Sequence, residues 1–127
     1  MFNELYKYGN EIALIGEKNE KITYKKLVLE SDKIQKNIKK NSLVLLICKN
    51  SIESIIGYIS LLKNDHITIM ADANFEKKYL NRLVNIYKPR YIFSQRNFFN
   101  QKHLKEIYNL REFSLFENYK HTKAKIN

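Results

Sequence analysis

A continuous apolar run at residues 43–48, LVLLIC, constrains the fold of this chain more than any other feature of its sequence. Its length and polar flanks indicate a β-strand. Because successive side chains of a strand point to opposite faces, the unbroken run predicts burial on both faces, which is typical of parallel sheets. Residues 52–62 then carry Ile and Leu at helical spacing, which predicts a helix packed on that sheet. Gly57 inside this helix indicates a close approach to a neighbouring element.

The rest of the chain alternates between strand-like and helix-like segments. Short β-like runs at residues 12–16 and 21–25 predict an N-terminal hairpin. Thr23 is expected to cap a helix that continues to about Ile38. Further strands are expected at residues 66–70, 90–94 and 111–116, with helices from Asn74 to the residues before Pro89 and near residues 99–110.

Length and composition favour a single folded domain. The chain has 127 residues, 44% of them apolar, and its one Pro and three Gly provide no flexible linker. We predict an α/β fold with a mostly parallel sheet covered by helices on both faces and an N-terminal β-hairpin. The expected domain spans residues 1–116, and residues 117–127 are predicted to form a polar, flexible tail.

The turn between the buried strand and its helix, CKNSIE at residues 48–53, is where many α/β enzymes bind a phosphate. Lys49, Asn50 and Ser51 could contact an anion there, aided by the helix dipole. A phosphate loop needs glycines, however, and this turn contains none. The alternative, which we favour, is that Asn50 and Ser51 cap the helix; Asn50 and Glu53 have capping-box spacing.

Other polar candidates have plainer interpretations. The three histidines are isolated and are expected to be surface or packing residues: His66, His103 and His121. Cys48, at the end of the apolar run, is expected to be inert core rather than a nucleophile. Asp65 and Asp72 flank the strand at residues 66–70. Asp72 follows its carboxyl end, where α/β folds bind ligands, but turn formation is the preferred interpretation.

The formal charge of +10 raises the alternative of a polyanion-binding protein. Of the 23 basic residues, 19 are Lys, whereas nucleic-acid sites favour Arg. The nearest approach to an aromatic stacking platform lies at residues 91–103. There Tyr91 and Phe93 share a strand face, and Phe98 and Phe99 are expected to pack at a helix start. A solvated Lys surface is therefore the favoured interpretation.

Cysteine content and hydropathy indicate where in the cell the protein is expected. A single Cys cannot form an internal disulfide, which favours a reducing, cytoplasmic setting. The N-terminal residues carry charges where a signal peptide needs an apolar segment. No apolar stretch approaches the ~18 residues of a membrane span.

Several segments, in order and spacing, resemble the N-terminal part of adenylate-forming enzymes. This superfamily includes acyl- and aryl-CoA synthetases, adenylation domains of peptide synthetases, and luciferases. The resemblance covers roughly residues 11–95. It includes ITY at residues 22–24 with Leu27, KNSIE at 49–53, LLKND at 61–65, and the segment from Leu83 to Ile92. The chain departs from the family in having KKNS before the buried strand, and in lacking a Pro after the strand at 66–70.

The resemblance implies a parent enzyme that couples a carboxylic acid to ATP and then transfers the acyl group to CoA or another acceptor. In this family the phosphate loop, the adenine-stacking aromatic residue, the ribose-binding Asp and the Lys of the C-terminal domain follow later. No position here matches them, so no catalytic, cofactor-binding or metal residue is expected. ATP and Mg²⁺ are implied only for the parent.

We therefore expect a non-catalytic N-terminal fragment of an AMP-forming acid ligase, either an expressed fragment or a truncated gene product. Its partner would be the remainder of the ligase, and apolar surface left exposed predicts a homodimer. The alternative is a free-standing basic module that binds nucleic acid or an acidic protein. A receiver-like or flavodoxin-like enzyme is a weaker third interpretation, because LVLLICKNS lacks the paired acidic residues of a receiver.

Overall fold

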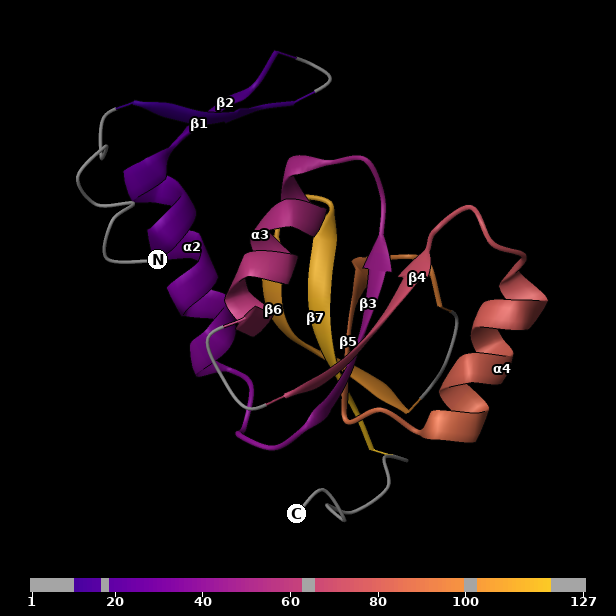
Figure 1. The fold of residues 1–127 in the computed structure, drawn as a ribbon. Helices are drawn as coiled ribbons and strands as arrows, with labels where there is room; N and C mark the ends of the chain where they lie inside the picture. The colour runs from indigo at the N-terminus through magenta and orange to yellow at the C-terminus, as the bar shows by residue number, and fades with distance from the viewer. Residues whose placement is uncertain (1–10, 17–18, 63–65, 100–102, 120–127) are drawn as a thin grey trace.

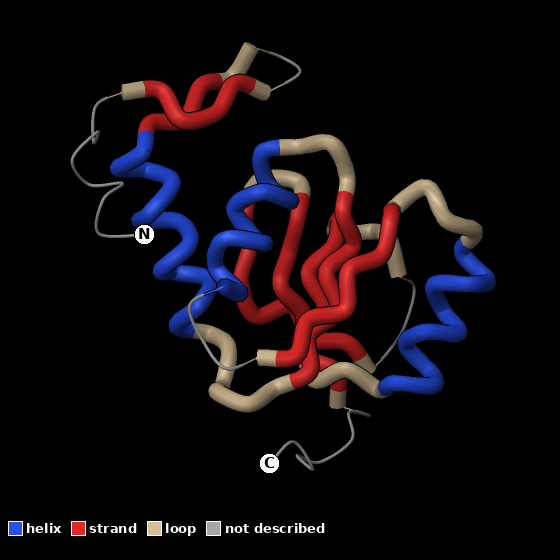
Figure 2. The backbone as a smooth tube through the Cα atoms, in the orientation of Figure 1, coloured by secondary structure: helices blue, strands red, loops and turns tan. Residues whose placement is uncertain are grey.

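The computed structural model describes residues 11–16, 19–62, 66–99 and 103–119 and contains a hairpin, three helices and a five-stranded sheet (Figures 1 and 2). The elements are β1 (Ile12–Ile15), β2 (Lys21–Thr23), α2 (Tyr24–Lys36), β3 (Leu43–Cys48), α3 (Ile52–Leu62), β4 (Ile67–Asp72), α4 (Lys77–Tyr87), β5 (Tyr91–Gln95), β6 (Leu104–Leu110) and β7 (Phe113–Asn118). Within these residues, no helix is long and apolar enough to cross a membrane.

The strand order in the sheet is β4-β3-β5-β7-β6. The strand predicted from LVLLIC is β3, and it pairs in parallel with both β4 and β5. The pairs β5–β7 and β7–β6 are antiparallel. The predicted α/β fold and its antiparallel N-terminal hairpin, β1–β2, are thus present. The sheet, however, is mixed rather than mostly parallel, because two of its four strand pairings are antiparallel.

The helix expected near residues 99–110 is wrong: residues 104–110 form the strand β6. Leu104, Ile107 and Tyr108 have helical spacing, which suggested the helix. The register of β6 against β7 shifts between Glu106 and Tyr108. One extra residue in a strand interrupts the alternation of apolar and polar positions, so the segment loses its two-residue period. The strand expected at 111–116 is present as β7, which continues to Asn118.

Two hydrophobic clusters flank β3, and its alternating side chains supply both. Val44 and Leu46 pack into a cluster with residues of α2 and α3, whereas Leu45 and Ile47 pack into a second cluster with residues of α4. All four side chains are at most 1% exposed. Figure 1 shows α2 and α3 on one side of the sheet and α4 on the other. The double burial predicted from the apolar run is therefore observed.

For α2 and α4, two of the expected helix ends are present and one is not. Thr23 caps α2, with its side-chain oxygen accepting from the Lys26 N–H at 3.2 Å. The helix α4 ends at Tyr87, followed by Lys88 in a left-handed conformation and then Pro89. Asn74 does not cap α4, which begins three residues later; its N–H instead donates to the Asp72 carboxylate at 2.8 Å.

The apolar stripe predicted on α3 is only half buried. Ile52 and Ile56 are buried, but Ile55 and Leu62 are 40% and 47% exposed. The buried face of α3 includes Gly57 instead. A Cβ atom added at Gly57 would lie 2.7 Å from two ring carbons of Phe93 on β5. The absence of a side chain is thus what lets α3 approach the sheet this closely.

We predict that Gly57→Ala destabilises the fold, although Ala is the better helix former by ~1 kcal/mol. The added methyl would collide with the Phe93 ring, which is 1% exposed and enclosed by the core. Overpacking of this kind costs ~1–3 kcal/mol, so a net loss of about 1 kcal/mol is expected in urea denaturation. In a Phe93→Leu background the same substitution should be neutral or stabilising. Equal effects in both backgrounds would show that the ring contact is not the cause.

Candidate functional site

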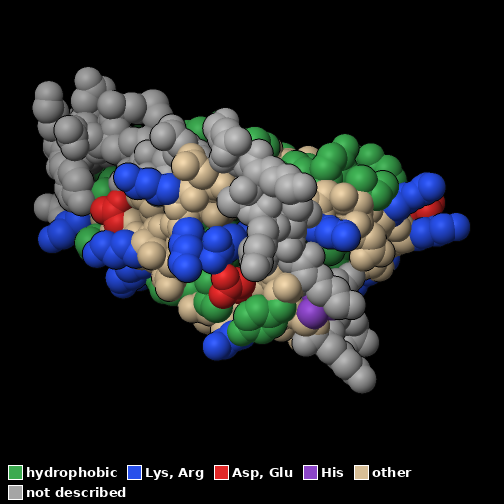
Figure 3. Space-filling model, turned by 90° about the horizontal axis from the view of Figure 1, so that it is seen from below, with side chains coloured by type: hydrophobic (Ala, Val, Ile, Leu, Met, Phe, Trp, Pro, Cys, Tyr) green, Lys and Arg blue, Asp and Glu red, His purple; other side chains and the backbone are tan. Residues whose placement is uncertain are grey.

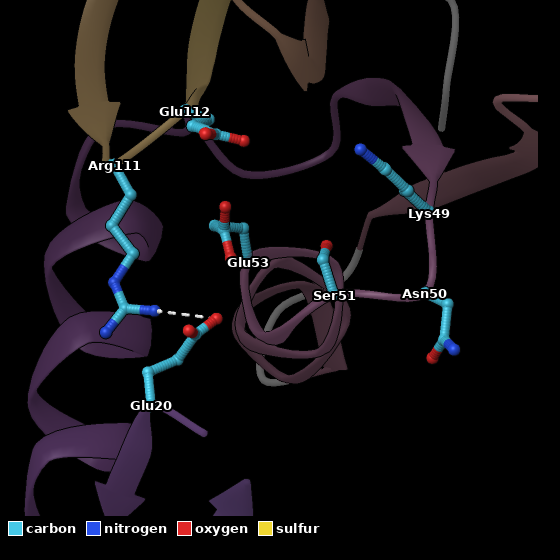
Figure 4. Close-up of a pocket in the computed structure, with 7 residues that line it drawn as sticks. All are labelled: Glu20, Lys49, Asn50, Ser51, Glu53, Arg111 and Glu112. Carbon is cyan, nitrogen blue, oxygen red and sulfur yellow. Dashed lines mark ion pairs between the residues drawn. The ribbon is translucent and has the colours of Figure 1, made fainter. Parts of the chain in front are cut away.

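A polar cavity of about 630 Å³ lies at the carboxyl end of β3 and is the candidate site (Figure 4). We call it the carboxyl-edge cavity. Its lining comes from the turn after β3, the first turn of α3, the β6–β7 turn and the residue before β2. The lining residues are Glu20, Lys49, Asn50, Ser51, Glu53, Arg111 and Glu112.

Sheet topology explains why a cavity forms here. From β3 the chain passes through α3 to β4 on one side, and from β4 through α4 to β5 on the other side of β3. Such a reversal opens a crevice beyond the carboxyl ends of the strands, where open α/β sheets bind ligands. A second cavity, of about 410 Å³, continues along this edge beyond β5 and shares Glu112 with the first.

The candidate anion-binding turn is organised around the helix cap. The Ser51 Oγ accepts from the Ser54 N–H at 3.3 Å and lies 3.2 Å from the Ser54 Oγ, which accepts from the Lys49 N–H at 2.8 Å. Ser51 is therefore the cap of α3, and the expected capping box of Asn50 with Glu53 is wrong. Because α3 begins at Ile52, Asn50 lies one residue too early to cap it.

The charges around the cavity do not suit a polyphosphate. Two cationic side chains, Lys49 and Arg111, face three carboxylates, those of Glu20, Glu53 and Glu112. The Arg111 Nη1 atom lies 3.8 Å from the Glu20 Oε1 atom (Figure 4). This half-exposed ion pair contributes at most ~1 kcal/mol to stability. Glu53 is only 6% exposed and lies in the first turn of α3, where the helix dipole favours its negative charge. These residues do not fit ATP with Mg²⁺.

Cys48 and Asp72 end the neighbouring strands β3 and β4 and are paired in register. The Asp72 carboxylate accepts from the Asn74 N–H, which is the turn role preferred from the sequence. Cys48 is half-buried. Burial raises the pKa of its thiol, and the nearby Asp72 charge raises it further. A raised pKa leaves less thiolate at neutral pH, so the thiol is a poor nucleophile.

The remaining sequence candidates do not converge on a site. His66 precedes β4 and His103 precedes β6, whereas Asp65 and His121 lie outside the described residues. Among the residues described, no group of three or more His, Cys, Asp or Glu could hold a metal. The aromatic residues of the suggested stacking platform are largely interior: Tyr91 is 2%, Phe93 1% and Phe98 9% exposed.

Sequence reasoning missed the contribution of Glu20, Arg111 and Glu112 to the cavity. Arg111 and Glu112 form the tight turn between β6 and β7, and Arg111 adopts a positive φ of 58°. Non-glycine residues rarely adopt this conformation, so the dipeptide Arg111-Glu112 does not predict a turn from its sequence. A β6–β7 hairpin would have been needed to place this pair near Lys49, and that segment was expected to be helical.

Comparison with known proteins shows which solved structures share this fold. Neither a family model nor a curated protein matches the sequence. Solved structures do match, and they confirm the resemblance to adenylate-forming enzymes at the level of the fold. The N-terminal subdomain of NpsA from Klebsiella oxytoca has a TM-score of 0.61 at 22% identity over 73% of this chain. A luciferase-like enzyme of the mealworm Zophobas morio has a TM-score of 0.57 at 21% identity over 72% of this chain.

These structures are much longer than the matched region. The chain spans 26% of the NpsA subdomain and 23% of the luciferase-like enzyme. The NpsA subdomain is also known in complex with anthranilyl-AMSN, and that structure matches with a TM-score of 0.58 at 24% identity, over 72% of this chain and 25% of that one. The likeness establishes a shared fold over about a quarter of each solved chain.

The cap assignment predicts unequal effects of two neighbouring substitutions. Ser51→Ala removes the oxygen that accepts from the Ser54 N–H, and loss of a helix cap costs ~1 kcal/mol. Asn50→Ala alters an exposed side chain outside the helix and should cost less than ~0.5 kcal/mol. Urea denaturation of both variants measures the difference. A larger loss for Asn50→Ala would restore Asn50 as the cap.

The environment of Cys48 predicts slow alkylation. At neutral pH, iodoacetamide should modify Cys48 more slowly than an unstructured cysteine peptide, because the raised thiol pKa leaves less thiolate. Asp72→Asn removes the neighbouring charge while keeping an oxygen for the Asn74 N–H, so the pKa should fall and alkylation at neutral pH should accelerate. Mass spectrometry of the rate against pH tests this. A thiol pKa at or below that of the peptide, or one unchanged by Asp72→Asn, would contradict it.

Proposed function

We propose that this chain is a non-catalytic N-terminal portion of an AMP-forming acid ligase of the acyl-CoA synthetase-like kind. The observation that carries the proposal is the fold shared with the NpsA subdomain and with the luciferase-like enzyme. The sequence segments that resemble adenylate-forming enzymes, roughly residues 11–95, include the hairpin, all three described helices and the parallel strands. Sequence and fold therefore support the same assignment.

The reaction proposed for the whole enzyme joins a carboxylic acid to ATP. A carboxylate oxygen attacks the α-phosphorus, pyrophosphate leaves, and the resulting acyl-adenylate passes its acyl group to CoA or another acceptor with release of AMP. The residues for this chemistry belong to later segments of the proposed ligase, which would bind ATP and Mg²⁺. The proposed location of the ligase is the cytoplasm.

The contribution proposed for this portion is a scaffold. A buried strand held between two clusters gives a rigid support for the neighbouring parts of an enzyme. The carboxyl-edge cavity, with its excess of carboxylates, is not assigned to the nucleotide. The partner of this portion is accordingly the remainder of the ligase.

The alternative function, a basic module for a polyanion, stays a prediction from the charge of +10. Figure 3 views the molecule from below and shows Lys and Arg in several separate groups, with apolar, acidic and uncharged surface between them. Polyanion sites favour a continuous basic stripe, so the distribution on this face gives the alternative no added support.

We predict that the 127-residue chain does not bind ATP with Mg²⁺ at micromolar concentrations in isothermal titration calorimetry. The carboxyl-edge cavity has more carboxylates than cations, and its turn lacks the glycines that let backbone N–H groups surround a phosphate. The far-UV circular dichroism spectrum of the same sample serves as the control that it is folded. Micromolar affinity would show that the chain carries its own nucleotide site and would contradict the scaffold role.

The matching positive test uses the native gene product. Its reading frame should continue past the codon for Asn127 into a Ser/Thr/Gly-rich loop, and that product should exchange pyrophosphate with ATP when supplied with a suitable carboxylic acid. The 127-residue chain alone should show no exchange. A native product that ends at Asn127 would make this chain a free-standing protein that has lost, or never had, that chemistry.

A further inference from the structure

The two edges of the five-stranded sheet differ in how well they are protected against pairing with another strand. One edge is β6, which carries exposed Lys105 and Glu106 and a register irregularity next to them. Charged side chains and bulges are devices that keep an edge strand from adding a further strand. The edge at β6 is therefore protected.

The opposite edge, β4, has fewer of these devices: its one charged residue, Asp72, is exposed but stands at the end of the strand. Its sequence, ITIMAD, contains no Lys, Arg or Pro, and its six residues pair with β3 without an irregularity. Ile67 and Met70 are 50% and 53% exposed. Within the described residues, β4 has a strand neighbour only on its β3 side. A regular, apolar edge of this kind is a template for β-strand addition.

The hydrogen-bonding groups of this edge can be assigned. The Ile67 N–H donates to the Ser42 carbonyl, and the Ala73 N–H donates to the Cys48 carbonyl, so the odd-numbered residues of β4 face β3. Because both backbone groups of a strand residue point to the same side, the N–H and C=O of Thr68 and Met70 point to the open edge. These are the groups that a further strand would bind.

We propose that β4 pairs with β4 of a second copy of this chain, antiparallel about a two-fold axis, to form one continuous sheet. Centred on Ile69, this pairing sets Thr68 of one copy opposite Met70 of the other, and each such pair exchanges two hydrogen bonds. Ile67 then faces Ala71. No two like charges lie opposite each other within the strand, so the edge is complementary to itself.

The protection of β6 is the reason that the pairing closes at two copies. A β4–β6 contact between copies would be heterologous and would continue into an open filament. The charges and irregularity of β6 oppose that contact. A β4–β4 contact uses the same edge of both copies and leaves only protected edges outside. The expected assembly is therefore a closed dimer of twice 15.2 kDa.

Net charge gives the dimer a characteristic salt dependence. Each copy has a formal charge of +10, so two copies repel each other across a backbone-mediated interface whose paired residues, 67–71, are uncharged. Salt screens this repulsion, with a Debye length of ~8 Å at 0.15 M. Dimerisation should strengthen as salt is added, whereas binding of a polyanion would weaken.

The test is sedimentation velocity of the 127-residue chain over a wide concentration range at low and moderate salt. We expect a monomer–dimer equilibrium that shifts toward dimer with salt. Met70→Lys places a charge on the open edge and should leave a single 15.2 kDa species. Ile86→Lys is the matched control. Ile86 is 63% exposed on α4, so this variant adds the same charge away from the edge and should still dimerise.

A backbone test separates strand pairing from side-chain contact. Thr68→Pro removes an outward N–H without removing any hydrogen bond to β3, and it should also abolish the dimer. In hydrogen exchange, the Thr68 and Met70 amides of the unmodified chain should become protected as concentration rises. Circular dichroism checks that each variant is folded, and the exchange result holds even if Thr68→Pro does not fold.

Three results would overturn the proposal. One is a monomer at every concentration with fast-exchanging Thr68 and Met70 amides, which would show that the β4 edge stays unpaired. Another is a dimer that persists in Met70→Lys, which would place the interface elsewhere. The third is a dimer lost in Ile86→Lys but kept in Met70→Lys, which would assign it to α4. None of these outcomes depends on whether the ligase assignment is correct.

Discussion

Burial of β3 on both faces is the constraint on which the rest of the structure depends. Its side chains alternate between two clusters, one shared with α2 and α3 and the other with α4. Each helix therefore has to pack closely enough to exclude water from one face of a single strand. Gly57 meets this requirement for α3, because the space of its missing side chain is filled by the Phe93 ring. A strand with polar residues on one face would have needed helices on only the other.

The same arrangement determines what the carboxyl edge can do. Parallel β3 and β5 flank the point where the chain reverses direction through the sheet, and a cavity opens beyond them. The α3 N-terminus there is already capped by Ser51, and a nearly buried Glu53 occupies its first turn. The positive end of the helix is thus satisfied from within the chain. The fold has the usual location of an α/β ligand site, but the described residues there satisfy the helix end themselves.

The two edges of the sheet differ in how readily they can pair with a further strand. Residues that block pairing gather at β6, whereas β4 keeps regular geometry and apolar side chains. The charge of +10 suggests a polyanion partner, but it also makes two copies of the chain repel each other. Pairing between copies is therefore suited to an edge strand whose paired residues are neutral.

The sequence by itself determined the local elements: the hairpin, the Thr23 cap, the doubly buried strand and the end of α4 before Pro89. These follow from periodicity and capping, which depend on residues close in the chain. Only the tertiary structure decided that residues 104–110 form a strand, because a register shift hides the two-residue period and pairing with β7 outweighs local preference. It also decided that Arg111 and Glu112 join Lys49 around one cavity. Local pattern specifies which face of an element is buried, but the partner that buries it is chosen by contacts between residues distant in sequence.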